Sequence, residues 1–239
     1  MRIALLGYGR MGREVESAAE AGGHAVVVRT DIDNPDGFNS STASGCDVAI
    51  EFSGPEAAAD NIIRALSLGV PVVSGSTGWL ARYDEVVGVC TKKNGSFIHS
   101  SNYSIGVNIL FRLNAEMARM MNLLPGYSPA IDEIHHVKKL DAPSGTAITL
   151  AGDIVRMHHT YNGWQKADEK ADPEKIPVSS VREGTVPGIH SVTWRSDADI
   201  IILKHEALSR KGFASGALLA AAYISTRKGV FTMADVLSL

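Results

Sequence analysis

Short apolar runs alternate with amphipathic segments through the first part of the chain. The runs are rich in Val, Ile and Leu, which is typical of buried strands, and the segments between them repeat apolar residues at helical spacing. Such an alternation predicts an α/β domain with a parallel, doubly wound sheet. The predicted strands span residues 2–6, 25–31, 47–52, 71–74 and 96–99, and the predicted helices span residues 10–21, 55–68 and 80–92.

The pattern changes after about Gly106. Two predicted helices, residues 107–122 and a segment beginning after Ser144, accompany strand-like runs that indicate an α+β domain with a mixed, largely antiparallel sheet. These strands span residues 129–136, 178–182, 189–194 and 199–205. The polar stretch 158–175, with His158 and His159 exposed, is expected as a surface loop. A final apolar helix over residues 214–226 is expected to return to the first domain, so the predicted domains are residues 1–106 with 214–239, and residues 107–213.

The first predicted strand runs directly into Gly7-Tyr8-Gly9-Arg10-Met11-Gly12, a G-x-G-x-x-G sequence. Between a strand and a helix, the first glycine permits a tight turn, the second lets the backbone approach a pyrophosphate, and the third lets the helix pack on the strand. Asp31 ends the next predicted strand, near the roughly 20-residue offset of a carboxylate that binds the adenosine ribose. The sequence therefore predicts that residues 1–106 and 214–239 form a dinucleotide-binding domain.

Three further loops leave the carboxyl ends of predicted strands, where ligands bind in doubly wound sheets. They comprise residues 53–55, 75–78 and 100–103. We expect the last two of these loops to line the dinucleotide together with the glycine loop. The predicted cofactor-binding residues are Gly7, Tyr8, Gly9, Arg10, Met11, Gly12, Asp31, Gly75, Ser76, Thr77, Ser100, Ser101, Asn102 and Tyr103.

Candidate catalytic and anion-binding residues lie close together between residues 135 and 147. His135 and His136 follow an apolar strand, and Lys139 lies four residues after the first of them. Ser144 then begins a helix as its N-cap, and the free backbone N–H groups of a helix start attract a carboxylate or phosphate. Proton-transfer groups thus lie beside an anion cradle. No metal site is expected, because adjacent residues on a strand point to opposite faces and no third ligand has suitable spacing.

Composition and charge narrow the classes of function. Hydrophobic residues make up 45% of the 239 residues, enough for the core of one large or two small domains. The formal net charge of −3 gives no support for a nucleic-acid partner, and no apolar run reaches the about 18 residues that indicate a membrane helix. Cys46 and Cys90 are too few and too isolated for a disulfide framework or a redox pair. The chain start passes directly into a strand rather than a signal peptide, so we expect a cytoplasmic enzyme.

The block His135-His136-x-x-Lys139-x-Asp141-Ala142-Pro143-Ser144-Gly145-Thr146-Ala147 resembles the dihydrodipicolinate reductase family, also called 4-hydroxy-tetrahydrodipicolinate reductase. The glycine loop and four further segments resemble the same family in the right order along the whole chain; these segments are residues 75–78, 101–108, 181–184 and 205–217. The block from the two histidines to Ser-Gly-Thr is specific to that family, whereas the glycine loop is shared by many dehydrogenases.

The resemblance implies an NAD(P)H-dependent oxidoreductase of diaminopimelate and lysine biosynthesis. Its substrate would be a small cyclic dicarboxylate, 4-hydroxy-tetrahydrodipicolinate, which it reduces to tetrahydrodipicolinate. The resemblance further implies that His135 is the acid/base histidine and that Lys139 is the proton donor. The implied substrate-binding residues are His136, Ser144, Gly145 and Thr146 in the domain of residues 107–213. Finally, it implies a homotetramer assembled through the sheets of that domain.

Two questions about charged residues stay open at the level of sequence. Asp141 either orients Lys139 or closes a turn onto Ser144. Arg182 and Arg210 either meet the second carboxylate of the substrate or form ion pairs elsewhere.

The cofactor preference follows from the end of the second predicted strand. Asp31 would bind the 2′- and 3′-hydroxyls of NADH and repel the 2′-phosphate of NADPH. Arg29 lies two residues before it, but no basic residue follows immediately to bind that phosphate. The sequence therefore favours NADH over NADPH.

Two other functions are compatible with a two-domain dinucleotide-binding chain. A sugar or inositol dehydrogenase of this plan usually carries a Glu-Lys-Pro motif where this chain has Gly75-Ser76-Thr77. A non-catalytic NADH-sensing regulator would need a basic DNA-binding helix pair, which neither the net charge nor any Lys/Arg stripe supports. Consumption of NADH with the dicarboxylate substrate would separate the three alternatives.

Overall fold

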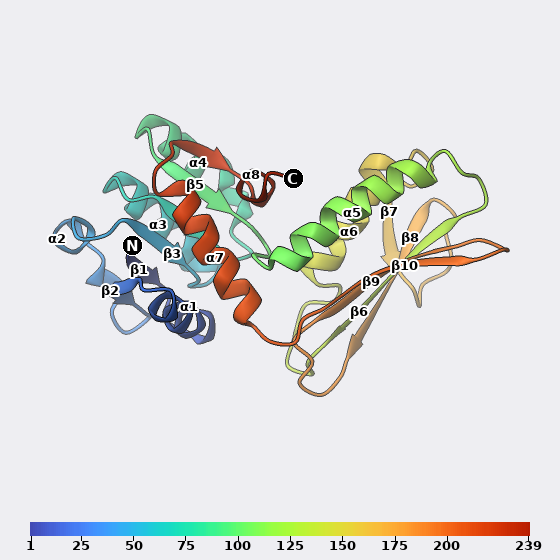
Figure 1. Cartoon of the computed structure of the whole chain (residues 1–239), viewed down its shortest axis with the longest axis horizontal. Helices are drawn as coiled ribbons and strands as arrows, with labels where there is room; N and C mark the ends of the chain where they lie inside the picture. Colours follow the sequence, from blue (N-terminus) through green and yellow to red (C-terminus); the bar gives the residue numbers. More distant parts are fainter. The chain divides into compact units, whose positions relative to one another are not determined.

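The computed structural model describes all residues from 1 to 239 and divides into two compact units. The first unit comprises Met1–Ile105 and Arg210–Leu239, and the second comprises Gly106–Ser209. Each unit has its own β-sheet and its own apolar core (Figure 1). None of the helices combines the length and the apolar character that a bilayer crossing requires.

The first unit is built on a six-stranded sheet with the order β11-β5-β4-β3-β1-β2, in which every pairing is parallel. The central strands are buried along almost their whole length because helices cover both faces of the sheet. The predicted parallel, doubly wound sheet is therefore confirmed, with β11 as a short strand that the sequence pattern did not reveal. The strands are β1 (Arg2–Leu6), β2 (Ala25–Thr30), β3 (Val48–Glu51), β4 (Val72–Ser74), β5 (Ser96–His99) and β11 (Gly229–Phe231).

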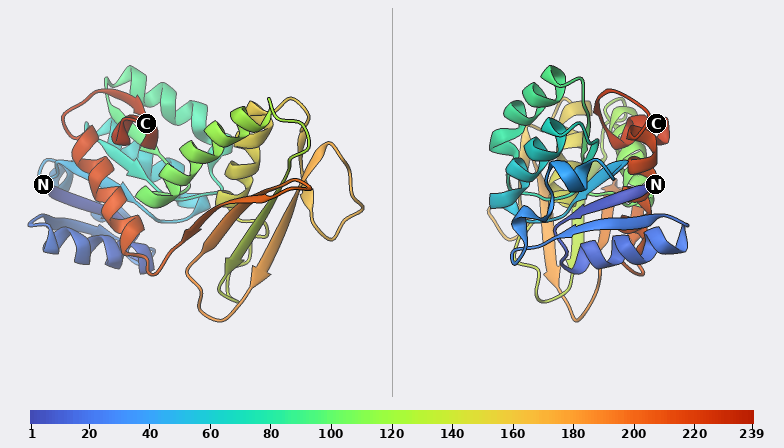
Figure 2. Two further views of the ribbon diagram at one scale, coloured as in Figure 1. Left: turned by 45° about the vertical axis from the view of Figure 1, so that its right-hand side comes forward. Right: turned by 90° about the vertical axis from the view of Figure 1, so that its left-hand side faces the viewer.

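Helices α1 and α7 cover one face of this sheet, and helices α3 and α4 cover the other (Figure 2). The alternation along β1 explains both cores, because Ile3 and Leu5 pack with α1 and α7 whereas Ala4 and Leu6 pack with α3 and α4. The return of the C-terminal helix to the first domain is confirmed, since the small residues of α7 are buried in this core. The helices are α1 (Arg10–Ala21), α2 (Ser40–Ala43), α3 (Pro55–Ser67), α4 (Tyr83–Lys92), α7 (Lys211–Ile224) and α8 (Met233–Leu237), with short 3-10 turns η1 (Pro35–Gly37) and η2 (Leu80–Arg82).

The second unit packs two helices against one face of a five-stranded sheet with the order β10-β9-β6-β8-β7. Its core joins Leu110 of α5 and Leu150 of α6 to Ile131 of β6 and Trp194 of β9. The elements are α5 (Ile105–Met121), β6 (Ser128–His135), α6 (Gly145–Met157), β7 (Gly163–Lys166), β8 (Lys175–Arg182), β9 (Ile189–Arg195) and β10 (Ile200–Glu206).

The predicted mixed sheet of the second unit is confirmed, but antiparallel pairings do not dominate it. Strand β9 pairs antiparallel with β10 and β6, whereas β8 pairs parallel with β6 and β7. Helix α6 carries the chain back along the sheet after β6, and the segment 167–174 carries it back again after β7, so that β7 and β8 both run in the same direction as β6.

The stretch 158–175 is not the continuous surface loop that its polar composition suggested. Strand β7 lies within it and pairs with β8 at the edge of the sheet. His158 is buried rather than exposed, because it follows directly after α6 and its ring packs 5.7 Å from Trp194 and 4.9 Å from Tyr161, measured between ring centroids. His159 is exposed as expected.

Candidate active site

The glycine loop of the first unit has the strand–turn–helix setting that the sequence predicted. Gly7 has a φ of 104°, and a Cβ added there would lie 2.4 Å from the carbonyl oxygen of Phe52. A Cβ at Gly12 would lie 2.4 Å from the carbonyl oxygen of Gly7, so both positions require glycine. A Cβ at Gly9, in contrast, would have no heavy atom within 4 Å. Gly9 is the N-cap of α1 and makes no side-chain cap, which leaves an open backbone cradle of the kind a pyrophosphate requires.

Asp31 and Arg29 differ in how far they are available to a ligand. Asp31 is exposed directly after β2, and its Oδ1 accepts a hydrogen bond from the Ile32 backbone N–H at 2.8 Å. The Arg29 guanidinium is bound to Glu16 of α1, with Nε 2.7 Å from Oε1, and the hydroxyl of Tyr8 donates to the same carboxylate. The cation nearest Asp31 in the sequence is therefore already paired.

The loops after β4 and β5 lie at the carboxyl edge of the sheet, as predicted, but several of their side chains face the protein. Tyr103 is buried, and its hydroxyl donates to the Ser74 carbonyl oxygen at 2.8 Å. Ser76 and Asn102 are also buried, whereas Thr77 and Ser101 are exposed. Tyr103 can thus contribute its backbone to a ligand, but its ring belongs to the core.

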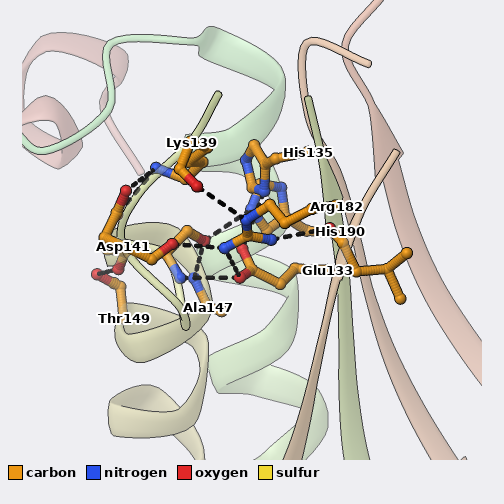
Figure 3. Close-up of polar contacts among 11 residues, drawn as sticks. Glu133, His135, Lys139, Asp141, Ala147, Thr149, Arg182 and His190 are labelled. Atoms are coloured by element: carbon orange, nitrogen blue, oxygen red, sulfur yellow. Dashed lines mark hydrogen bonds and ion pairs between the residues drawn. The ribbon is translucent and has the colours of Figure 1, made fainter. Parts of the chain in front are cut away.

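The second unit brings two histidines and a carboxylate together on the helix-covered face of its sheet (Figure 3). Glu133 and His135 lie two residues apart on β6 and so share a face. The sheet register places His190 of β9 opposite Glu133, and Arg182 of β8 opposite His135. The rings of His135 and His190 meet edge to face, with centroids 4.9 Å apart.

Glu133 is fully buried and is the centre of this cluster. Its Oε1 accepts from the Ser144 backbone N–H at 3.0 Å and from Arg182 Nη2 at 3.1 Å, and its Oε2 lies 3.0 Å from His135 Nδ1. Burial by itself raises the pKa of Glu133, but the polar contacts from His135, Ser144, Ser180 and Arg182 together lower it well below its usual range. The group is therefore a fixed negative charge at neutral pH.

His190 connects the cluster to the start of α6. Its Nε2 lies 3.2 Å from Ser144 Oγ, and that hydroxyl accepts from the Ala147 backbone N–H, also at 3.2 Å. The predicted Ser144 N-cap is therefore confirmed. Burial and the neighbouring His135 lower the pKa of His190 to about 4, so this ring is neutral at pH 7.

The segment from Lys139 to Asp141 is held by contacts that the sequence left undecided. Lys139 Nζ lies 2.7 and 2.8 Å from the two carboxylate oxygens of Asp141, so Asp141 pairs with this lysine (Figure 3). Arg182 donates to the Lys139 carbonyl oxygen at 3.3 Å and to the Asp141 carbonyl oxygen, in addition to Glu133. Arg182 thus connects Glu133 to the segment from Lys139 to Asp141. Arg210 lies in the first unit, at the N-cap of α7.

The remaining residues that were predicted to bind the substrate lie at the start of α6 and directly after β6. Gly145 is exposed as the first residue of α6, and a Cβ there would meet no heavy atom within 4 Å. Thr146 is buried beside it. His136 is half-buried directly after β6. The segment therefore offers an accessible helix start next to the cluster of Glu133 and His135.

Glu133, His135 and His190 could also be considered as metal ligands, because their donor atoms all lie within 4.8 Å of one another. The sequence pattern does not reveal this trio, because His190 reaches Glu133 only through the pairing of β9 with β6. The guanidinium of Arg182 is already paired with the Glu133 carboxylate, however, and its positive charge opposes a second cation there. The geometry fits a carboxylate that holds a histidine better than it fits a cation site.

Glu133 and His190 are the residues that the sequence interpretation missed. A signal existed for Glu133, since it precedes His135 by two positions on a strand and must share its face. No comparable signal existed for His190, which reaches the cluster only through the pairing of β9 with β6.

Comparison with known proteins gives one consistent result. The sequence model described as "Dihydrodipicolinate reductase, N-terminus" matches residues 1–103, and the one described as "Dihydrodipicolinate reductase, C-terminus" matches residues 106–237. The 4-hydroxy-tetrahydrodipicolinate reductase of Christiangramia forsetii is 48% identical over 100% of this chain and 98% of its own, and that of Staphylococcus carnosus is 36% identical over 99% of both. Among solved structures, a dipicolinate-bound dihydrodipicolinate reductase from Paenisporosarcina sp. TG-14 has a TM-score of 0.78 at 21% identity and covers 97% of each chain, which shows a shared fold.

These matches span both units and bear out the resemblance carried by the block from His135 to Ala147. The chain therefore belongs to the dihydrodipicolinate reductase family and is an oxidoreductase that uses a nicotinamide cofactor.

Proposed function

We propose that this chain reduces 4-hydroxy-tetrahydrodipicolinate to tetrahydrodipicolinate in the diaminopimelate route to lysine, and that His135 and Lys139 supply the proton. In this proposal residues 1–106 and 214–239 bind the dinucleotide, and residues 107–213 bind the substrate. The observation that supports it best is that Arg182 hydrogen-bonds both to Glu133, the partner of His135, and to the carbonyl oxygen of Lys139. The family models match residues 1–103 and 106–237 of the same chain.

The reaction sets the demands on these residues. Loss of the 4-hydroxyl as water leaves a ring carbon conjugated to an imine, and a bound reduced nicotinamide supplies hydride to that conjugated system. The charge that hydride adds must be met by a proton from the protein. Glu133 Oε2 lies 3.0 Å from His135 Nδ1, which favours the tautomer with its hydrogen on that nitrogen and leaves Nε2 for the substrate. Gly188 keeps side-chain atoms away from Nε2, since a Cβ there would lie 3.0 Å from it.

The two carboxylates of the substrate need partners, and the start of α6 offers one. Ser144 and Gly145 begin a helix whose first turn carries no acidic residue, so its partial positive charge is available to an anion. We assign one substrate carboxylate to Gly145 and Thr146, with His136 as a further contact. Lys139 has 22% of its side chain exposed, and Asp141 occupies only two of its three N–H groups. The third can be directed to the anionic ligand.

The test of this function follows the absorbance of NADH while the preceding synthase supplies the substrate. We expect consumption that depends on the substrate, with a higher kcat/KM for NADH than for NADPH. The reason for the preference is that Asp31 is an exposed carboxylate at the ribose position, whereas Arg29 is paired with Glu16, which also accepts from the Tyr8 hydroxyl, and is not free for a 2′-phosphate.

The outcomes of this assay separate the alternatives. A higher kcat/KM with NADPH would contradict the role of Asp31 but not the reaction. No consumption by a chain that still binds NADH would contradict the reductase function and favour the regulator. Turnover of a polyol instead of the dicarboxylate would favour the sugar dehydrogenase.

We also propose a homotetramer assembled through the open face of the second unit's sheet. That face leaves apolar side chains in water, because Ile200, Ile202 and Val181 are 44%, 58% and 43% exposed. Light scattering should give the mass of four chains, and Ile202→Lys should reduce it. A monomeric mass for the unaltered chain would refute the assembly.

A further inference from the structure

The buried carboxylate of Glu51 lies in the first unit and takes no part in the proton transfer described above. It is the last residue of β3 and is fully buried. Its Oε1 accepts from the Ser53 backbone N–H at 2.7 Å, from Ser53 Oγ at 2.6 Å and from Ser76 Oγ at 2.6 Å, and its Oε2 accepts from Ser74 Oγ at 2.7 Å. All four donors are backbone or serine groups near the carboxyl edge of the sheet.

These donors belong to adjacent loops that the fold brings to one edge. Glu51 pairs with Ser74 in the register of β3 and β4, so Ser53 and Ser76 both begin loops beside it. The carbonyl oxygen of Ser74 in turn accepts from Tyr103 Oη at 2.8 Å and from the Ser100 backbone N–H at 3.2 Å. The loops after β3, β4 and β5 are therefore connected to one carboxylate within two hydrogen-bond steps.

The loop after β4 is also fixed from its other side. The carbonyl oxygen of Ser76 accepts from Trp79 Nε1 at 2.9 Å and lies 3.2 Å from His99 Nε2. Ser76 is thus held by its hydroxyl on Glu51 and by its carbonyl on two buried or half-buried rings. Such complete fixation leaves Gly75 and Thr77 with few backbone conformations.

A buried carboxylate is a costly means of stabilising a core. Its removal from water carries a penalty that apolar residues of similar size avoid, so its presence is better explained by the geometry it imposes than by stability. Hydrogen bonds to an ionised acceptor are roughly twice as strong as neutral ones, which makes one carboxylate able to fix several loops.

We propose that Glu51 is a positioning residue for the dinucleotide: it fixes the loops after β3, β4 and β5 in the arrangement that binds the cofactor. The proposal rests on the proposed function, in which Gly75, Ser76, Thr77 and residues 100–103 contact the dinucleotide. It assigns to Glu51 an effect on cofactor affinity and none on substrate affinity.

The test compares Glu51→Gln with the unaltered full chain. Glutamine keeps the size of the side chain but removes its charge and replaces one acceptor oxygen by a donor. We expect the Kd for NADH, measured by titration calorimetry, to rise by about tenfold, the KM for NADH to rise with it, and kcat at saturating NADH to stay unchanged. The Kd for a pyridine dicarboxylate should not change. Glu51→Asp retains the charge and should recover part of the affinity.

Two further variants keep the test decisive. Ser74→Ala removes the donor to Oε2 and should raise the Kd for NADH in the same direction even where Glu51→Gln folds poorly. Ser96→Ala is the matched control. Ser96 is the first residue of β5 and so lies at the amino ends of the strands, away from the loops that Glu51 contacts, and its Oγ donates to the Ile224 carbonyl oxygen at 3.0 Å. This substitution should lower the Tm and leave the Kd for NADH unchanged.

The results distinguish a failure of the inference about Glu51 from a failure of the proposed function. If the unaltered chain binds NADH and both the Glu51→Gln and Ser74→Ala variants bind it equally well, Glu51 serves only the fold and the inference is overturned. If Ser96→Ala weakens NADH binding as much as they do, the effect is general loss of stability and the inference is again overturned. If the unaltered chain binds neither NADH nor NADPH, the proposed cofactor site itself is wrong.

Discussion

His135→Gln should lower kcat by about 10²- to 10⁴-fold, the usual contribution of a positioned proton-transfer group. Glutamine replaces an imidazole whose Nδ1 lies 3.0 Å from Glu133 by an amide that does not gain or lose a proton near neutral pH, so it cannot deliver one to the substrate. The Kd for NADH should not change, since His135 belongs to the second unit and the glycine loop to the first. Steady-state kinetics with saturating NADH, together with calorimetric titration of NADH, measure both quantities.

His158→Gln is the matched control for this substitution. His158 is also a buried histidine of the second unit, but its ring packs on Trp194 and Tyr161 rather than on Glu133. It should reduce the Tm and leave kcat unchanged. A kcat for His135→Gln within the range of the control would remove His135 from the chemistry.

Glu133 explains why the histidine is competent in this position. Its carboxylate is fully buried and lies 3.0 Å from Nδ1, so it holds the imidazole in one orientation. Arg182 balances the charge of Glu133 and at the same time bonds to the carbonyl oxygen of Lys139. One ion pair therefore sets the positions of both groups to which we assign proton transfer.

Local sequence signals were sufficient for much of the fold and for part of the site. The turn from β1 to α1 follows from Gly7 and Gly12, whose conformational and steric demands lie within a few residues. The N-cap of α6 follows from Ser144 in the same way. Both features depend on neighbouring residues, which a single sequence displays directly.

Features that depend on sheet register could not be predicted in this way. Arg182 and His190 reach Glu133 because β8 and β9 flank β6, although Glu133 and Arg182 are 49 positions apart in the sequence. The parallel direction of β8 depends on two returns of the chain, through α6 and through the segment 167–174, and β7 is a four-residue edge strand without an apolar pattern. Side-chain periodicity predicts which face a residue occupies but not which strand lies beside it.

Lys139→Ala should lower kcat by about 10²-fold or more and, unlike His135→Gln, should also raise the KM for the dicarboxylate. The ammonium group is a proton donor in our assignment, and it is also a positive charge facing a doubly anionic ligand. Loss of the proton donor raises the free energy of the transition state, whereas loss of the positive charge also weakens the binding of the substrate. The Tm should change little, because the partner Asp141 is 57% exposed and such an ion pair contributes about 0–1 kcal/mol.

Lys138→Ala tests whether the position of the charge matters or only its sign. Lys138 is the exposed neighbour of Lys139 and carries the same charge, so general attraction of a dianion would be reduced equally by either substitution. We expect its kcat and KM to remain those of the unaltered chain. Equal, small effects of Lys139→Ala and Lys138→Ala would mean that Lys139 only attracts the substrate from a distance. If Lys139→Ala instead reduces kcat and leaves KM unchanged, the charge of Lys139 acts only in the transition state. The proton would then come from the third N–H of Lys139 Nζ, the one that Asp141 does not occupy.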